Sequence, residues 1–353
     1  MNIRIFQPLS IHEIGKRDNQ EDSISPSLGE ATETDRVFVL CDGMGGHEHG
    51  EVASQTVCQT ISKFMHGHWP SDDRVDDQLV LDAINAAFEA LDDKDDGAAK
   101  RMGTTLTLVV LHAGGCTAAH IGDSRIYHIR SSEHKVLYRS RDHSLVTDLF
   151  QAGEISYEEM KTSPQKNIIT KAMQPGEDNR VRPDIVHIGD LQPGDYLYMC
   201  SDGMLERMED SELVSILCYN ASNKEKRECL VRETTSNNDN HSAHLIQIRK
   251  VKKERGEVVA DDEATNRCNF LNIMPEAIDA IEVEEIPAEV EEASTGKRQK
   301  TLNDIGRRVL WLAFIVVALI AIVMLFFTRN DRNEKTAPVQ QQHIEMKPIE
   351  HNK

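Results

Sequence analysis

Aspartates lie at the ends of two apolar runs that predict buried strands, and a third aspartate lies in a polar loop before a late strand. Asp42 follows the apolar run 37–41 and precedes three glycines within four residues. Asp202 follows the apolar run 196–200, and Asp239 lies just before another apolar run. Carboxylates beside glycine turns can hold a hard cation or face a phosphate group. For any one of them alone, a tight turn with an exposed aspartate is an equally good interpretation.

Two further polar stretches carry residues that could join such a site. The run 17–23 contains Arg17, Glu21 and Asp22. Adjacent side chains on a strand point to opposite faces, so Glu21 and Asp22 reach a common site only near a strand end or bend. The alternative is a solvated charged loop, with Arg17 either in a surface ion pair or clamping a phosphate. Asp123 lies in a short interruption of a predicted strand, which is typical of a bulge or of a ligand's approach.

Composition narrows the classes of function. The net charge of −19 argues against nucleic acid as the main partner, because surfaces that follow phosphates are basic. The length of 353 residues suits one domain of about 250 residues plus a tail. The seven cysteines are scattered and never spaced as C-x-x-C, which predicts neither disulfides nor a zinc site and favours a reducing cytosol. The N-terminus lacks the layout of a signal peptide. His47 and His49 lie in a polar turn and are interpreted as solvated.

Hydrophobic periodicity predicts alternating helices and strands through residue 250. Helical spacing predicts helices at 51–69, 75–91, 210–218 and 224–234. Apolar runs predict strands at 37–41, 104–111, 196–200 and 243–248, and a hairpin turn at 113–115 leads into a partner strand at 116–130, interrupted at 122–125. The segment 141–172 is mostly polar, with a helical piece at 145–153, and is either a mobile flap or a connecting loop.

The C-terminal hundred residues differ in kind. The segment 251–308 is rich in glutamate and favours a disordered linker, with an amphipathic helix at 276–286 as the competing interpretation. Residues 309–328 form a run of twenty without a charge. As a helix such a run spans about 30 Å, the thickness of the hydrocarbon core of a bilayer. Aromatic residues near both ends fit a membrane interface. We therefore predict a transmembrane helix at 309–328 and a short polar tail at 329–353.

Seven short motifs, taken in order, resemble those of one family. They are Arg17-x-x-x-Glu21-Asp22, Asp42-Gly43-Met44-Gly45-Gly46, Met102-Gly103-Thr104-Thr105, Ile121-Gly122-Asp123-Ser124-Arg125, Asp142-His143-Ser144-Leu145, Ser201-Asp202-Gly203 and Asp239-Asn240. Over about residues 8–250 the chain resembles the metal-dependent, type 2C serine/threonine protein phosphatases in their bacterial form. The resemblance implies an α+β fold, a four-layer α-β-β-α sandwich of two antiparallel sheets flanked by helices. To this catalytic domain, residues 1–250, we add the single C-terminal transmembrane anchor.

The resemblance also implies roles for particular residues. It implies two Mn²⁺ or Mg²⁺ ions in the site and a third that binds more weakly. It implies that Asp42 bridges the two ions and that the Gly43 carbonyl contacts one of them. Glu21, Asp202 and Asp239 would complete the site of the pair, with Asp22 contributing from behind Glu21 or through a water. Asp123 and Asp202 would hold the third ion. Arg17 matches the residue that binds phosphate, and residues 144–170 match the variable flap. We therefore expect Arg17 and Asp42 to be the principal catalytic residues.

Two positions depart from the family pattern. Met44 stands where many relatives have a histidine proposed as general acid, so the general acid is unassigned, with His47 or a metal-bound water as candidates. Glu206 stands where the family often has an aspartate, and a longer carboxylate there could ligate a metal or hydrogen-bond a bound water.

The expected function is hydrolysis of phosphoserine and phosphothreonine in proteins by attack of a metal-bridging hydroxide, opposing a bacterial serine/threonine kinase. We expect a single-pass protein of the inner membrane with its catalytic domain in the cytoplasm. The partners would be phosphorylated proteins, the kinase or its substrates. Two alternatives stay open, a catalytically inactive regulator that binds phosphoproteins and a phosphatase of a small phosphometabolite.

Overall fold

The computed structural model describes residues 2–44, 49–95, 97, 101–176 and 180–252. The chain divides into two units, Met1–Val283 and Glu284–Lys353, and every described residue belongs to the first. The predicted transmembrane helix and tail, and the predicted linker beyond Lys252, lie outside the described residues. Among the helices that are described, none combines the length and the apolarity that a membrane span requires.

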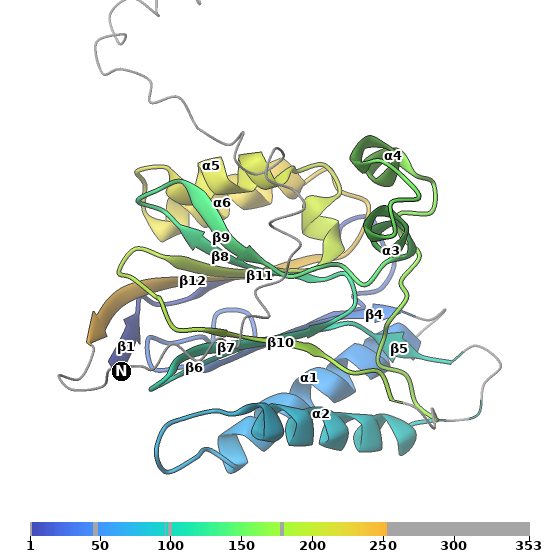
Figure 1. Ribbon diagram of the computed structural model, residues 1–353, viewed down its shortest axis with the longest axis horizontal. Helices are drawn as coiled ribbons and strands as arrows, with labels where there is room; N and C mark the ends of the chain where they lie inside the picture. Colours follow the sequence, from blue (N-terminus) through green and yellow to red (C-terminus); the bar gives the residue numbers. More distant parts are fainter. Residues whose placement is uncertain (1, 45–48, 96, 98–100, 177–179, 253–353) are drawn as a thin grey trace, which may run out of the picture. The chain divides into compact units, whose positions relative to one another are not determined.

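Two antiparallel sheets form the centre of the domain (Figure 1). The first has the order β1-β12-β11-β8-β9, with β2 also paired to β12; the second has the order β10-β7-β6-β4-β3, with β5 paired to β4. The strands of the first are β1 (Asn2–Ile5), β2 (Leu9–Glu13), β8 (Arg125–Arg130), β9 (Lys135–Arg139), β11 (Tyr196–Cys200) and β12 (His241–Lys252). Those of the second are β3 (Asp22–Ser25), β4 (Val37–Met44), β5 (Gly103–Thr104), β6 (Leu106–His112), β7 (Gly115–Ile121) and β10 (Asp184–Ile188).

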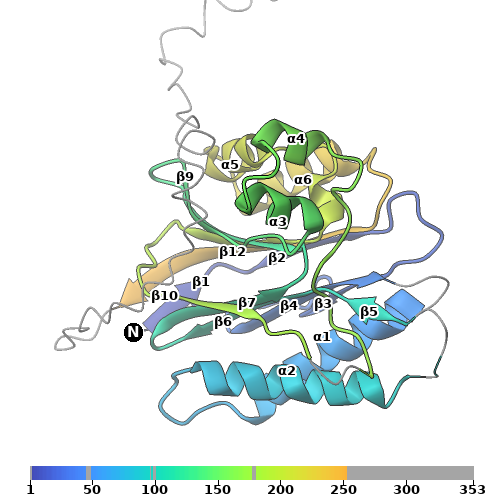
Figure 2. The ribbon, with the colours of Figure 1, turned by 45° about the vertical axis from the view of Figure 1, so that its right-hand side comes forward.

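Helices cover the outer face of each sheet (Figures 1 and 2). Helices α1 (His49–Gly67) and α2 (Asp77–Asp92) lie on the second sheet, and α5 (Asp210–Cys218) and α6 (Asn223–Thr234) lie on the first. The short helices α3 (Leu145–Gln151) and α4 (Tyr157–Thr162) belong to the predicted flap, and η1 (Asp202–Leu205) is a 3-10 turn. The expected sandwich of two antiparallel sheets flanked by helices is therefore confirmed.

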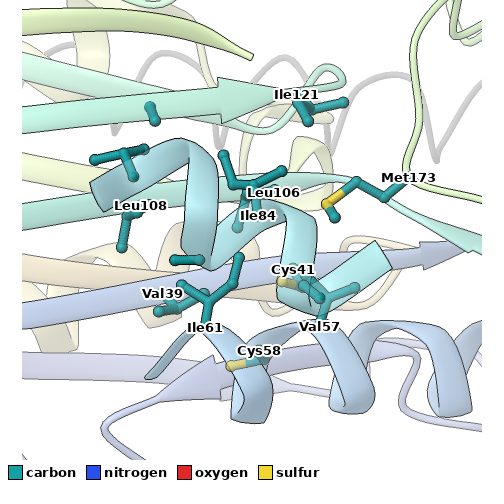
Figure 3. Packing of buried hydrophobic residues seen from close by; sticks show 14 of the residues in the cluster. Val39, Cys41, Val57, Cys58, Ile61, Ile84, Leu106, Leu108, Ile121 and Met173 are labelled. Carbon is teal, nitrogen blue, oxygen red and sulfur yellow. The ribbon is translucent and has the colours of Figure 1, made fainter. Parts of the chain in front are cut away.

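Alternation along the central strands explains why they appear as unbroken apolar runs. On β4, Val39 and Cys41 pack against α1 and α2, as Figure 3 shows, whereas Phe38 and Leu40 face the other sheet. On β11, Leu197 and Met199 face the other sheet, whereas Tyr196, Tyr198 and Cys200 lie in the core under α5 and α6. Successive side chains of a strand point to opposite faces, and here both faces are buried.

One strand prediction was wrong. The interval 116–130 is not a single strand with a bulge, because β7 ends at Ile121 in one sheet and β8 begins at Arg125 in the other. The interruption is the crossing between the sheets. Gly122 has φ of +103°, and a Cβ there would lie 2.6 Å from Thr105 Cγ2, so glycine is required on both counts. Strands β1, β2, β3, β9 and β10 were missed because they are short or rich in polar residues.

His244 joins the two sheets at their centre. Its Nδ1 lies 2.9 Å from Ser10 Oγ within its own sheet, and its Nε2 lies 3.3 Å from the Val39 carbonyl oxygen of the facing sheet. The Phe38 ring meets it edge to face. A carbonyl only accepts, so Nε2 donates and Nδ1 accepts from the serine hydroxyl. Burial lowers the pKa of His244 to about 4, which keeps the ring neutral in the folded protein.

This burial predicts a pH-dependent contribution to stability. Below pH 6.5, His244 binds a proton in the unfolded chain but stays neutral in the folded protein. The folded state therefore loses stability as the pH falls from 6.5 to about 4. His244→Gln removes that penalty. The free energy of unfolding of the wild type relative to the variant should fall by up to about 1.4 kcal/mol per pH unit over this range. Urea unfolding in EDTA between pH 7 and 4.5 measures it, and a constant difference would contradict the assignment.

Candidate active site

The predicted carboxylates gather where several strands end at one edge of the sandwich. Asp42 lies near the end of β4, directly opposite Asp22 at the start of β3. The backbone of Asp42 is fixed by Thr105, whose N–H donates to the Asp42 carbonyl at 2.8 Å. Thr105 Oγ1 in turn accepts from the Asp42 N–H at 3.0 Å. Asp42 itself is half-buried.

Asp202 is brought to the same edge by the end of β11. The preceding Ser201 donates its hydroxyl to Asp22 Oδ2 at 2.8 Å, which links the first sheet to the second at this point. The loop before β12 packs closely behind, since a Cβ at Gly203 would lie 2.0 Å from the Asn240 carbonyl oxygen. Asn237 Nδ2 donates to the Gly203 carbonyl at 2.7 Å. The Asp202 and Asp239 loops are thus held against each other.

The side chain of Asn240 holds the loop that carries Arg17 and Glu21. Its Oδ1 accepts from the Glu21 N–H at 2.8 Å. Its Nδ2 donates to the carbonyls of Ile14 and Asn19 at 2.8 and 2.9 Å. This one amide therefore fixes residues 14–21 relative to the β12 end of the site. The sequence motif contains Asn240, but its position gave no indication of this role.

Glu21 lies beside the turn that follows Asp42. The Gly43 N–H donates to the Glu21 carbonyl at 3.0 Å. A Cβ at Gly50 would lie 2.8 Å from Glu21 Oε1, so glycine near the start of α1 leaves room for this carboxylate. Gly50 was not among the predicted site residues. Its role depends on a contact between segments far apart in the chain.

The carboxylates strongly disfavour one another's charge. Burial, followed by repulsion from Asp22 and Asp202, raises the pKa of Asp42 well above its usual range. Burial and then Asp202 do the same for the pKa of Asp123. The pKa of Asp22 is raised to about 7 and that of Asp202 to about 6, again chiefly by burial. The site therefore contains more negative charge than the described protein groups neutralise.

Two oxygen atoms in this cluster mark where positive charge is needed. Asp22 Oδ1 and Asp123 Oδ1 are buried and have no hydrogen-bond partner among the described residues. A buried carboxylate oxygen without a partner is costly unless it coordinates a cation. Hard oxygen donors at strand ends are the ligands that Mg²⁺ and Mn²⁺ prefer. The residues present therefore fit divalent metal ions.

Arg17 lies at the rim of the same cluster. Its Nη2 donates to Asp239 Oδ2 at 2.7 Å, and its side chain is 55% exposed. The hydrogen bond to Asp239, with smaller contributions from Glu21 and Asp42, raises the pKa of Arg17. The guanidinium therefore forms an ion pair, which was one of the two interpretations of Arg17, and more than half of its side chain is exposed.

Glu206 has a different role from the one that its position suggested. Its carboxylate accepts from the Asn238 N–H at 2.6 Å and from the Asn238 side chain at 2.5 Å. It also accepts from the Asp239 N–H at 3.3 Å. These bonds occupy Glu206 in shaping the loop of Asp239, so its assignment as a metal ligand is not supported. Met44 ends β4, and His47 lies outside the described residues.

A cavity of about 720 Å³ opens beside the carboxylates. Arg17, Asp123, Asp202 and Asp239 are among its lining residues. Most of the rest of the lining comes from β8, β9, the predicted flap and the η1–α5 segment. The flap residues that line the cavity are Ser144, Val146, Thr147, Tyr157, Met160, Lys161, Lys166 and Asn167. This part of the wall is therefore both apolar and basic, and the space is large enough for several residues of a polypeptide.

Comparison with known proteins identifies the family. A family profile for protein phosphatase 2C matches residues 12–241. Protein phosphatase PhpP of Streptococcus pneumoniae is 34% identical over 223 residues, covering 62% of this chain and 86% of its own length. Serine/threonine phosphatase stp of Listeria monocytogenes is 28% identical over 229 residues, covering 62% of this chain and 87% of its own.

A solved structure agrees in fold and in chemistry. The catalytic domain of the serine/threonine protein phosphatase PstP, in complex with two manganese ions, matches with a TM-score of 0.57 and 26% identity. The match covers 70% of this chain and all of that domain. Sequence, fold and a carboxylate cluster suited to divalent cations therefore agree. The chain belongs to the protein phosphatase 2C family and is a metal-dependent protein serine/threonine phosphatase.

Proposed function

We propose that Asp42, the Gly43 carbonyl, Asp202 and Asp239 hold a pair of Mn²⁺ or Mg²⁺ ions, with Glu21 and Asp22 supporting the pair. Asp123 and Asp202 would hold a third, weaker ion. The observation that carries this assignment is the buried, unpartnered oxygen of Asp22 and of Asp123 within a cluster of carboxylates with raised pKa values. When bound, such a pair neutralises phosphate charge and lowers the pKa of a bound water.

The chain's own residues would then bind and orient the substrate. Arg17 lies where a phosphoryl group meets the cluster, and its planar fork suits two phosphoryl oxygens. The hydrogen bonds of Asn240 and Glu206 hold Glu21 and Asp239 in place before substrate arrives. The cavity beside them accommodates the polypeptide around a phosphoserine or phosphothreonine. The residue that protonates the leaving alkoxide is unassigned, since Met44 cannot do so.

The two alternative functions meet different difficulties. An inactive phosphoprotein-binding relative should have lost some of the six carboxylates, and this chain keeps all of them. Five of the six, all except Glu21, are close enough for their charges to repel one another. A small phosphometabolite would leave most of the cavity unfilled. Activity on a phosphothreonine peptide and on p-nitrophenyl phosphate, each with Mn²⁺, Mg²⁺ or EDTA, distinguishes the three.

We further propose that the substrates are products of a serine/threonine protein kinase, or the kinase itself. Residues 309–328 would anchor the protein in the inner membrane, with the catalytic domain in the cytoplasm. Support comes from the uncharged run and from the free cysteines of the described domain, which suit a reducing compartment. The linker would give the domain a reach of roughly 40 Å from the bilayer.

The first prediction concerns the metal pair. Asp42→Asn removes one charge from the ligand proposed to bridge both ions, so hydrolysis should fall by several orders of magnitude while the fold persists. Addition of Mn²⁺ should also no longer raise the thermal unfolding midpoint as it does for the wild type. Asp82→Asn, on the exposed face of α2, is the matched control. Near-normal turnover of Asp42→Asn at saturating Mn²⁺ would refute the assignment.

The second prediction separates phosphate binding from metal binding. Arg17→Ala should weaken binding of phosphate and substrate yet leave Mn²⁺ affinity nearly intact, because the ion pair of Arg17 is with Asp239 at the rim of the cluster. Arg17→Lys should restore little, since a point charge lacks the planar fork. Calorimetry with Mn²⁺ and with inorganic phosphate measures both affinities. An equal loss of metal affinity would mean that Arg17 only positions Asp239.

The third prediction concerns the anchor. Truncation after Lys252, where β12 ends, should give a soluble phosphatase with nearly unchanged activity on a soluble phosphopeptide. The full chain should sediment with membranes and be extracted only by detergent. A full chain that stays in the soluble fraction would refute anchoring. Removal of the catalytic domain by protease added to intact cells would refute the cytoplasmic location.

A further inference from the structure

The flap, residues 144–170, leaves the sandwich and returns to it at one point. The Leu145 N–H donates to the Ile168 carbonyl at 2.8 Å, and the Thr170 N–H donates to the His143 carbonyl at 2.8 Å. Ser144 and Ile169 form an isolated bridge. The two ends of the flap are therefore paired like the stem of a hairpin. Whatever holds this stem also sets the position of the cavity wall.

Asp184 of β10 contacts both sides of that stem. Its Oδ2 lies 3.3 Å from His143 Nε2, and its Oδ1 lies 3.5 Å from Lys171 Nζ. Arg141 Nη2 lies 3.9 Å from the same carboxylate. Arg141 and His143 precede the flap and Lys171 follows it. The hydrogen bond from His143 is the first of several contacts that lower the pKa of Asp184, so the carboxylate is ionised.

The cluster has the spacing of a metal site but the wrong hydrogen bonding. Donor atoms of His120, His143 and Asp184 lie within 4.8 Å of one another, and His120 Nδ1 has no partner among the described residues. However, both ring nitrogens of His143 are already engaged. Nδ1 accepts from the Gly122 N–H at 3.1 Å, and Nε2 lies 3.2 Å from Lys171 Nζ and 3.3 Å from Asp184 Oδ2. The two imidazole rings are also stacked at 4.7 Å and 5°, so their in-plane lone pairs do not converge. The cluster is therefore a hydrogen-bonded clamp.

The clamp is continuous with the predicted metal-binding residues on both sides. The His143 N–H donates to the Gly122 carbonyl at 2.9 Å, next to Asp123. On the returning side, Met173 and Thr104 exchange two backbone hydrogen bonds of 2.9 and 3.0 Å. Thr104 Oγ1 then donates to the Asp42 carbonyl at 2.9 Å. The stem of the flap is thus tied to the backbone at Asp42 and beside Asp123, and none of these bonds involves the side chain of Asp184.

We propose that Asp184 is a positioning residue for protein substrates, acting through His143 and Lys171 to fix the flap as a wall of the cavity. The proposal rests on the phosphatase function and adds to it a residue outside the site. A phosphopeptide needs this wall, because flap side chains line the space beside the phosphoryl position. A small aryl phosphate needs only the metal pair and Arg17. Loss of the clamp should therefore affect the two substrates differently.

Asp184→Asn tests this, because the amide keeps the shape and loses the charge that holds Lys171. We expect KM for a phosphothreonine peptide to rise about tenfold with kcat nearly unchanged. Parameters for p-nitrophenyl phosphate should stay within about twofold of the wild type. Asp184→Glu should recover part of the peptide KM. The matched control is Asp77→Asn, since Asp77 pairs with His187 of the same strand at 2.7 Å but lies away from the flap.

Lys171→Met removes the other partner and gives a second test. Its effect on peptide KM should resemble that of Asp184→Asn, and the double variant should be little worse than either single one. Equal losses on both substrates, or the same peptide defect in Asp77→Asn, would overturn the proposal by showing general damage. Unchanged peptide KM in both single variants would overturn it directly.

Limited trypsin digestion gives a readout that does not depend on activity. Exposed Lys161 and Lys166 lie in the flap, and a released flap should be cut there faster in Asp184→Asn than in Asp77→Asn. If the wild type hydrolyses neither substrate, the proposed function fails, and the digestion still decides whether Asp184 holds the flap. Equal cutting rates in the two variants would refute the clamp.

Discussion

Mutual repulsion among buried and half-buried carboxylates is the constraint on which this structure depends. Asp22, Asp42, Asp123 and Asp202 approach one another closely enough to raise one another's pKa, and two of their oxygens lack a partner among the described residues. Such an arrangement costs folding free energy unless cations enter it. Divalent cations relieve this repulsion, so the folded domain favours their binding. The rest of the fold serves to hold these groups together against their repulsion.

The sandwich supplies the necessary rigidity through three separate layers of apolar packing. Because β4 and β11 are buried on both faces, neither strand can shift without disturbing two cores at once. His244 adds a polar link between the sheets at their centre. Short side-chain bonds then finish the site, notably from Ser201 to Asp22 and from Asn240 to the loop of Glu21. Packing fixes the strands, and hydrogen bonds fix the side chains at their ends.

The parts that the sequence predicted well share one property, which is that their evidence is local. Asp42 and Asp202 follow apolar runs and precede glycine, so both the strand and its end are visible in a few residues. The roles of Gly50, Asn240 and Asp184 depend on partners distant in the chain, and no local pattern reveals them. The same reason explains the error at 116–130. A chain that passes from one sheet to the other within four residues has the same pattern of apolar and polar residues as a strand with a bulge.

The pairing of β12 has a consequence for how the protein is made. β12 lies next to β1, β2 and β11, so the first two strands of the domain have no strand to pair with until the last strand has been made. The loop just before β12 also supplies Asp239 and the amide that orders residues 14–21. A nascent chain on the ribosome therefore has neither a closed first sheet nor a complete catalytic edge until about residue 252 has emerged. A chain released before that point lacks the strand that completes the first sheet, and with it the loop's contribution to the catalytic edge.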